Sequence, residues 1–190
     1  MSDSESSMQQ SPLGLRHTAW KFAAQKHHGQ IYPGTELPYL LHIGMVLLAL
    51  LPALEEEDGL DADLGVCCAI LHDVIEDTGT AAEELEAVFG PSITAGVLAL
   101  SKKSSLPKAE AMRDSLIRIR REPREVWMVK LADRIANLGT PPVHWGREKC
   151  LSYAMEAQAI LDSLGEASPL LALKLASRIA AWQAGEYYRQ

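Results

Sequence analysis

Residues 71–78 read Leu-His-Asp-Val-Ile-Glu-Asp-Thr, and their four ionisable side chains interrupt an otherwise apolar segment. Imidazole and carboxylate groups are costly to bury without partners, so they should pair with one another or bind a cation. In a continuous helix, Glu76 lies four residues after His72 and Asp77 lies four residues after Asp73. The four side chains would then form one polar patch. The alternative is a solvent-exposed, acidic helix end.

Hydrophobic periodicity on both sides of this stretch predicts helices almost throughout the chain. The segments with helical spacing, separated by Gly- and Pro-containing loops, are residues 15–28, 40–54, 64–75, 81–89, 92–100, 108–121, 125–138, 147–164 and 169–187. The sequence contains no β-hairpin signal and no repeat of fixed period. We therefore expect a single all-α domain, a bundle of about seven to nine helices over residues 12–190. Residues 1–11 are Ser-rich and acidic, and we expect them to form a disordered tail.

Three helix ends are predicted from local signals. Thr80 and Glu83 have the spacing of a capping box, which would start the helix at residue 81. Gly90 and Pro91 should stop that helix. Pro52 and the acidic run that follows it should end the helix of residues 40–54.

Composition narrows the class of protein. The chain has 190 residues, a net charge of −7 and 47% hydrophobic residues, which is typical of a folded domain and argues against disorder. The acidic net charge argues against binding of duplex nucleic acid as the main function, because that requires many basic side chains. Residues 102–149 nevertheless hold 12 of the 18 basic side chains and 6 acidic ones, so a small anionic ligand stays compatible with the charge.

The cellular location is predicted from what the sequence lacks. No window approaches the about 18 apolar residues that a membrane span requires. The first 11 residues have neither the basic nor the apolar part of a signal peptide. Cys67, Cys68 and Cys150 form no paired framework, which favours reduced thiols. We expect a cytoplasmic protein that does not bind membranes.

Two further residues make a metal site plausible. His42 begins one apolar helix, and Asp133 lies inside another. Each alone would usually be a satisfied polar group in the core. With His72 and Asp73 they supply two imidazoles and two carboxylates, a mixed set that suits Mn²⁺, Fe²⁺ or Zn²⁺ with open positions for water. Such an ion activates water and polarises a phosphoryl oxygen, and nearby carboxylates would orient that water or take its proton.

The motifs in which these residues occur extend over roughly residues 16–164. They are His-Gly-Gln at 28–30, Pro-Tyr-Leu-Leu-His at 38–42, the stretch 71–78, Phe-Gly at 89–90, Lys-Leu-Ala-Asp-Arg at 130–134 and Asn137. This series resembles the HD-domain metal-dependent phosphohydrolases. Within them it is most similar to the hydrolase domain of RelA/SpoT proteins and to the small alarmone hydrolases of the Mesh1 type. The resemblance implies an α-helical HD fold that binds Mn²⁺ and removes the 3′-pyrophosphate from guanosine tetra- and pentaphosphate.

The resemblance also implies roles for individual residues. The metal ligands would be His42, His72, Asp73 and Asp133. Glu76 and Asp77 would position and activate the hydrolytic water. The residues that match substrate contacts are Asn137, Ser101, Lys102, Lys149 and Tyr153.

One departure from the family pattern concerns the nucleobase. These hydrolases usually carry Arg-Lys after His-x-Gly-Gln, and the arginine packs against guanine. After Gln30 this chain reads Ile31-Tyr32-Pro33-Gly34-Thr35-Glu36-Leu37-Pro38, with no Arg or Lys. Tyr32 would either stack on a base through its ring or pack beneath its own loop, and it supplies no cation.

We expect an enzyme that hydrolyses a small phosphorylated nucleotide, with guanosine 3′,5′-bis(diphosphate) as the leading substrate. The alternatives are an adenosine alarmone, NADPH, or a non-catalytic nucleotide sensor; a purely structural adaptor would bind no metal. The C-terminal helix belongs either to the core or to the interface of a homo-oligomer. His17, His27 and His28 match no ligand position, and we expect them on the surface or in helix packing.

Overall fold

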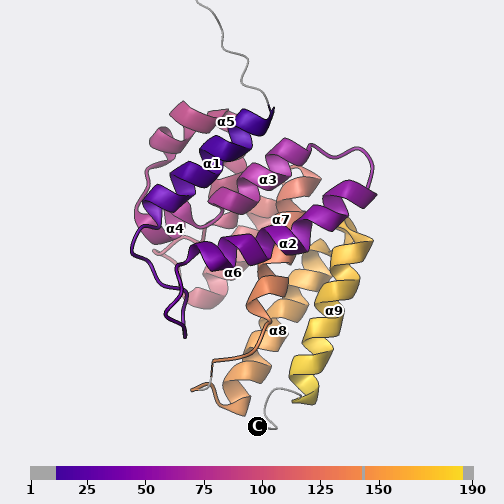
Figure 1. The fold of residues 1–190 in the computed structure, drawn as a ribbon. Helices are drawn as coiled ribbons and strands as arrows, with labels where there is room; N and C mark the ends of the chain where they lie inside the picture. The colour runs from indigo at the N-terminus through magenta and orange to yellow at the C-terminus, as the bar shows by residue number, and fades with distance from the viewer. Residues whose placement is uncertain (1–11, 143, 186–190) are drawn as a thin grey trace, which may run out of the picture.

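The computed structural model describes residues 12–142 and 144–185. The expected tail, residues 1–11, and the last five residues of the expected domain lie outside this part of the chain. The described residues form nine α-helices and one 3₁₀ turn, which confirms the expected all-α fold (Figure 1). The elements are α1 (Pro12–Lys26), α2 (Leu40–Glu56), α3 (Ala62–Leu71), α4 (Val74–Thr78), α5 (Ala82–Leu100), α6 (Lys108–Ile119), α7 (Arg124–Asn137), α8 (Arg147–Leu164), η1 (Gly165–Ala167) and α9 (Pro169–Ala184).

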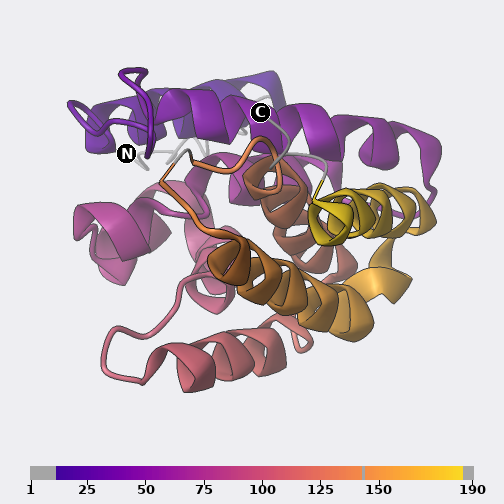
Figure 2. The ribbon, with the colours of Figure 1, turned by 90° about the horizontal axis from the view of Figure 1, so that it is seen from below.

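Helix α7 is the centre of the bundle. It packs against α2, α3, α8 and α9, and it lies between α2 on one side and α8 on the other (Figure 2). Its apolar residues Val126, Met128, Val129 and Leu131 are fully buried. Burial of this apolar surface is the main favourable contribution to folding.

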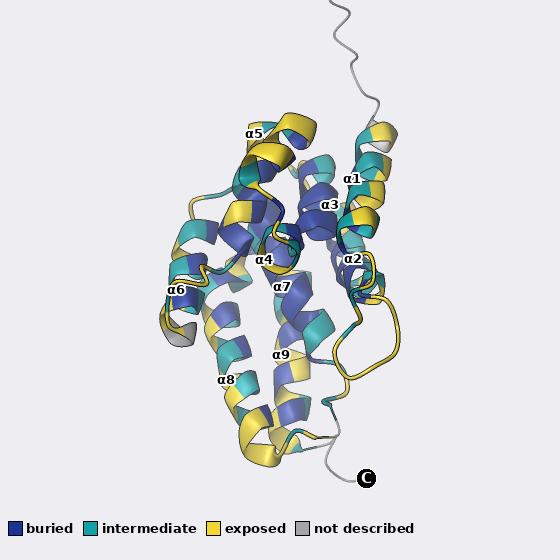
Figure 3. Ribbon diagram, turned by 90° about the vertical axis from the view of Figure 1, so that its left-hand side faces the viewer, coloured by how far each residue is buried: buried dark blue, intermediate teal, exposed yellow. Residues whose placement is uncertain are grey.

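Helix α3 is the second buried element. Every residue from Leu64 to Leu71 is buried, and Figure 3 shows buried residues running along both α3 and α7. The Asp61 side chain caps α3 by accepting hydrogen bonds from the backbone N–H groups of Asp63 and Leu64, both at 3.0 Å. Asp63 also pairs with Arg16 of α1, with 2.6 Å between Oδ1 and Nε.

The expected continuous helix over residues 64–75 is wrong. Helix α3 ends at Leu71, and α4 begins only at Val74, because Asp73 has φ −105° and ψ −2°. Adjacent residues of a straight helix point about 100° apart. The step at Asp73 brings His72 and Asp73 within 2.9 Å of each other, and Asp73, Glu76 and Asp77 line one cavity, so the expected polar patch forms without a continuous helix.

Two of the predicted signals for helix ends are also wrong, although α5 begins at Ala82, one residue after the predicted start. Thr80 hydrogen-bonds through its hydroxyl to Thr78 at 2.7 Å, and α5 starts after Ala81 without a side-chain cap. Helix α2 continues through Pro52 to Glu56. The carbonyl that Pro52 leaves without an N–H donor belongs to Leu48, on the exposed side of α2. The break predicted at Gly90 is confirmed as a bend in α5, where Gly90 has φ +77°.

Candidate metal centre and adjoining cavities

Four side chains from separate parts of the fold converge at one point. His42 lies in the first turn of α2, His72 and Asp73 lie between α3 and α4, and Asp133 lies in α7. The His42 Nε2 atom is 3.3 Å from His72 Nε2 and 3.4 Å from Asp133 Oδ1. Asp73 Oδ2 is 2.9 Å from His72 Nε2 and 3.7 Å from His42 Nε2. The structure thus brings together all four side chains predicted as metal ligands.

The donor chemistry of this cluster fits a divalent cation. His72 Nδ1 lies 2.8 Å from the carbonyl oxygen of Ala69, so Nδ1 carries the proton in the neutral ring and the lone pair of Nε2 faces the cluster. The ligand atoms of His42, His72 and Asp133 all lie within 4.8 Å of one another, and the three residues are buried. Two imidazole nitrogens and two carboxylates at this spacing form a nitrogen–oxygen set of the kind that binds divalent first-row metals.

Neighbouring charges in the cluster stabilise the ionised forms of His72 and Asp133. Burial alone would lower the pKa of His72, but the adjacent Asp73 carboxylate, with Asp133, raises that pKa to about 9. Burial opposes ionisation of Asp133, yet Lys130, with Nζ 2.9 Å from Oδ2, and the two histidines hold the pKa of Asp133 well below its usual range. The carboxylates are therefore ionised, and a metal ion would compete with a proton at His72.

A surrounding layer of hydrogen bonds orients the two carboxylates. The Tyr39 hydroxyl donates to Asp73 Oδ2, and the Asn137 amide donates to Asp133 Oδ1. Hydrogen-bonded partners of this kind fix the direction of metal ligands. Tyr39 and Lys130 belong to motifs quoted from the sequence, but they were given no role there. Their burial beside a charge is the signal that identifies them.

Glu76 and Asp77, the predicted water-activating acids, lie on α4 and line the same cavity as Asp73. The backbone N–H and the Nζ of Lys102 both donate to the Glu76 carboxylate, each at 2.8 Å. Gln30 Nε2 donates to Asp77 Oδ2, also at 2.8 Å. Both acids are therefore held by donors from other segments of the chain.

Two cavities adjoin, and candidate metal ligands line the first of them. The first has a volume of about 760 Å³ and is lined by three of the four candidate ligands, the two α4 acids and Lys102. The second has a volume of about 670 Å³; its walls include Tyr32, Trp145, Lys149 and Trp182. Asn137 and Tyr153 line both cavities, so they stand at the junction.

The residues predicted to contact substrate are thus distributed over the two cavities, with one exception. Ser101 is buried, and its hydroxyl donates to the carbonyl of Val97 at 2.8 Å, which ties down the end of α5. It is not among the residues that line either cavity. Lys102, its neighbour, lines the first cavity, and its ammonium group donates a hydrogen bond to Glu76.

Two aromatic residues in the second cavity have fixed orientations. The half-buried Tyr32 ring stacks on the His42 ring, with 5.7 Å between centroids and 8° between planes. The Tyr153 ring lies beneath the guanidinium group of Arg134, 4.3 Å from its carbon. Arg134 was not predicted as a site residue. Its membership of the Lys-Leu-Ala-Asp-Arg motif at 130–134 is the sequence signal that could have identified it.

Comparison with known proteins relates this geometry to characterised relatives. A family model described as HD domain matches residues 19–170. The guanosine-3′,5′-bis(diphosphate) 3′-pyrophosphohydrolase MESH1 of Danio rerio is 33% identical over 150 residues, which cover 75% of this chain and 80% of that protein. The guanosine-3′,5′-bis(diphosphate) 3′-pyrophosphohydrolase of Aquifex aeolicus is also 33% identical, over 77% of this chain but 20% of its own length.

A solved structure gives the same result at the level of the fold. It is described as a metazoan orthologue of SpoT that hydrolyses ppGpp, and it is 28% identical to this chain. The two superpose with a TM-score of 0.76, covering 87% of this chain and 94% of that one.

Proposed function

The chain belongs to the HD-domain family, and from this premise we propose that it removes the 3′-pyrophosphate from guanosine 3′,5′-bis(diphosphate). The observation that carries the proposal is the first cavity, where candidate ligands His42, Asp73 and Asp133 face the same space as Glu76 and Asp77. The relatives from Danio rerio and Aquifex aeolicus are named as hydrolases of this nucleotide, which supports the choice of substrate. Hydrolysis would transfer the pyrophosphoryl group to water, leaving a nucleoside 5′-diphosphate and pyrophosphate.

The ion that we propose for the site is Mn²⁺, held by His42, His72, Asp73 and Asp133. The two imidazoles and two carboxylates of this set support Mn²⁺, and Fe²⁺ or Zn²⁺ is the alternative. When bound, a divalent ion supplies Lewis acidity toward the phosphoryl oxygen and lowers the pKa of a coordinated water.

Residues of the chain itself would handle the proton and the developing charge. The Glu76 and Asp77 carboxylates are the acceptors that orient the attacking water and take its proton. Lys102, bonded to Glu76 through its backbone and side chain, fixes that carboxylate and brings a positive charge to the cavity wall. A positive charge next to the transferred group stabilises the charge that develops on the phosphoryl oxygens.

The two cavities suggest how a nucleotide would lie. The phosphates on the 3′ side would enter the first cavity, and the base would enter the second. The aromatic walls of the second cavity support this placement, because π faces stack on bases. Asn137 and Tyr153, at the junction, would then lie near the sugar, and Lys149 would meet the phosphates on the 5′ side.

A second candidate substrate follows from Tyr32. Its ring stacks on His42, and it offers a neutral hydroxyl where the related hydrolases commonly have arginine. Stacking tolerates every base. An adenosine alarmone or NADPH is therefore the second candidate, and it requires no change at the metal centre.

A nucleotide panel tests the proposal directly. Metal-loaded wild-type protein, Asp73→Ala and Glu76→Gln are incubated with guanosine and adenosine polyphosphates and with NADPH, and released pyrophosphate and phosphate are measured. We expect turnover of guanosine 3′,5′-bis(diphosphate) by the wild type and a loss of at least about 100-fold in each variant. Tight binding without product would instead indicate a nucleotide sensor.

The proposal extends to the domain bounds, the partner and the cellular location. The hydrolase domain would extend over residues 12–190, and the partner would be a small nucleotide and not a nucleic-acid duplex. None of the helices in the described residues is long and apolar enough to cross a membrane. Cys67, Cys68 and Cys150 are buried free thiols, which supports the cytoplasm as the location. A homo-oligomer stays a prediction.

A further inference from the structure

The turn after α1 reaches Asp77 through two side chains. His27 Nδ1 lies 2.7 Å from Gln30 Oε1, and Gln30 Nε2 lies 2.8 Å from Asp77 Oδ2. Gly29 has φ +80°, a conformation that glycine adopts without strain, and it turns the backbone between His27 and Gln30. We call these two side chains the His27–Gln30 bridge.

The direction of both hydrogen bonds is determined by chemistry. An ionised carboxylate can only accept, so the Gln30 amide must present its NH₂ group to Asp77 and its oxygen to His27. His27 must then carry a proton on Nδ1. The bridge therefore requires a donor at residue 27, and an apolar side chain of similar shape could not replace it.

His27 is well placed to anchor the bridge. It is buried, and its ring stacks on Tyr39, with 4.8 Å between centroids and 27° between planes. Tyr39 in turn donates to Asp73. His27 thus contacts Tyr39, which holds a candidate metal ligand, and it also contacts Gln30, which holds a candidate water-activating acid.

The backbone of Gln30 is fixed at both of its polar groups. Its N–H donates to the carbonyl of His27 at 3.0 Å, and its carbonyl accepts from the N–H of Tyr39 at 2.9 Å. Asp77 lies on the five-residue helix α4, where its side chain is exposed and has several rotamers to choose from. A fixed amide donor selects one of them.

We propose that His27 and Gln30 are positioning residues for the hydrolytic step. Gln30 holds Asp77 Oδ2, so Oδ1 is the oxygen that faces the attacking water and accepts its proton, and His27 keeps the Gln30 amide in the required orientation. This inference rests on the proposed function, because it assigns the bridge to the acid that activates water. From the sequence alone, His27 was expected on the surface or in helix packing.

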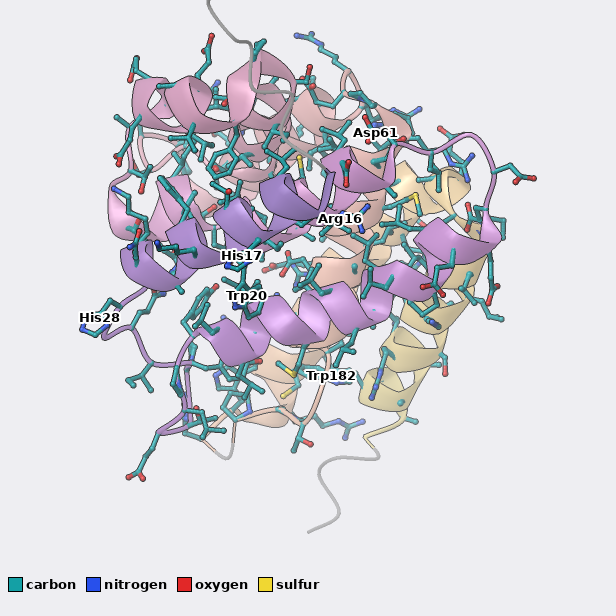
Figure 4. All side chains as sticks on the ribbon, turned by 45° about the horizontal axis from the view of Figure 1, so that its top comes forward. Arg16, His17, Trp20, His28, Asp61 and Trp182 are labelled. Carbon is teal, nitrogen blue, oxygen red and sulfur yellow. The ribbon has the colours of Figure 1, made fainter. Side chains whose placement is uncertain are left out.

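Four variants test the bridge. His27→Phe keeps a ring against Tyr39 but removes the donor, Gln30→Leu removes the amide, and His27→Asn restores a donor near the position of Nδ1. His28→Phe is the matched control, since His28 is exposed and points away from the bundle (Figure 4). Each is assayed with Mn²⁺ and guanosine 3′,5′-bis(diphosphate), and its metal content and Tm are measured.

We expect His27→Phe and Gln30→Leu to lower kcat by about 10- to 100-fold, with KM and metal content close to wild type, because a misplaced catalytic group costs rate and not ground-state binding. His27→Asn should recover most of the loss, and His28→Phe should match wild type. In an Asp77→Ala background, His27→Phe should cause no further loss.

Two results would overturn the inference while the proposed function stands. One is an active wild type whose kcat is unchanged in His27→Phe; the other is an equal loss with and without Asp77, which would mean that His27 acts elsewhere. Histidine side-chain NMR adds a readout independent of turnover, since the Nδ1–H tautomer of His27 should be present in wild type and lost in Gln30→Leu. A metal-loaded wild type that hydrolyses no nucleotide would overturn the proposed function and the positioning role together.

Discussion

At the scale of single residues, the candidate centre depends on side chains whose charges and orientations are set by neighbours. His72 shows this most clearly. Its Nδ1 is committed to the Ala69 carbonyl, so Nε2 is the atom for which a proton and a metal ion compete. When no metal is bound, the adjacent Asp73 carboxylate stabilises the protonated form of His72.

Metal affinity should therefore depend on pH. The pKa of His72 is about 9 in the folded protein against an ordinary value of 6.5, so its charge stabilises the metal-free fold below about pH 6.5 and that stabilisation is lost as pH rises toward 9. Affinity for Mn²⁺ should rise over the same interval, with release of close to one proton at pH 7. Calorimetric titration in buffers of different ionisation enthalpy measures that proton. The exposed His17→Gln should leave it unchanged, and an affinity independent of pH would contradict the assignment.

Base selectivity should respond to Tyr32. Tyr32→Arg supplies the cation and the paired donors that this loop lacks, and bidentate donation to guanine is worth about 1–3 kcal/mol of discrimination. We expect the ratio of kcat/KM for guanosine over adenosine polyphosphates to rise about 5- to 100-fold. Tyr32→Phe keeps the ring and should keep the wild-type ratio. A ratio that does not change in Tyr32→Arg would place the base outside the second cavity.

At the scale of elements, the step between α3 and α4 decides how the acids are presented. Helix α4 is only five residues long, and Gly79, with φ +68°, ends it in the left-handed region. A Cβ atom at residue 79 would meet nothing within 4 Å, so a substitution there changes backbone strain and not packing.

Gly79→Ala should lower the free energy of unfolding by about 1–2 kcal/mol, the cost of a left-handed conformation for a residue with a Cβ atom. Gly146→Ala is the matched control: it also has open space at Cβ, but its φ is −74°. Chemical denaturation of both variants gives the comparison. Equal stabilities would show that α4 does not need its left-handed end.

The sequence predicted most elements correctly and failed where tertiary contacts set the backbone. Periodicity sufficed for most helices around α7, whereas α3, buried at every residue from Leu64 to Leu71, is indicated by its apolar composition. It could not predict the break at Asp73, because the hydrogen bonds of His72 to Ala69 and of Tyr39 to Asp73 determine that turn. The order of motifs was enough to select the four candidate ligands. Gln30 of the His27–Gln30 bridge contacts Asp77, 47 positions further along the chain, and no spacing rule indicates such a contact.

At the scale of the whole molecule, the candidate centre ties separate elements together. His42 comes from α2, His72 and Asp73 come from the α3–α4 step, and Asp133 comes from the central helix α7. A cation that binds only when these elements are in place should stabilise the entire fold.

Removal of metal should accordingly lower the Tm. At an ion concentration 100 times the Kd, binding contributes about 2.7 kcal/mol to the free energy of unfolding. We expect added Mn²⁺ to raise the Tm of chelator-treated protein and to have little effect on Asp133→Asn. Asp63→Asn, which loses the Arg16 ion pair away from the cavities, should keep the full shift. A shift retained by Asp133→Asn would place the ion elsewhere.

Among the residues that the structure describes, Asn137 and Tyr153 alone line both cavities. The walls of the second cavity come largely from the loops before α2 and before α8, whereas the hydrolytic groups sit on helices or at their ends. Loops tolerate exchange better than buried helices. Grafting those two loops from a relative should therefore retarget the enzyme to a different nucleoside while its hydrolytic machinery stays intact.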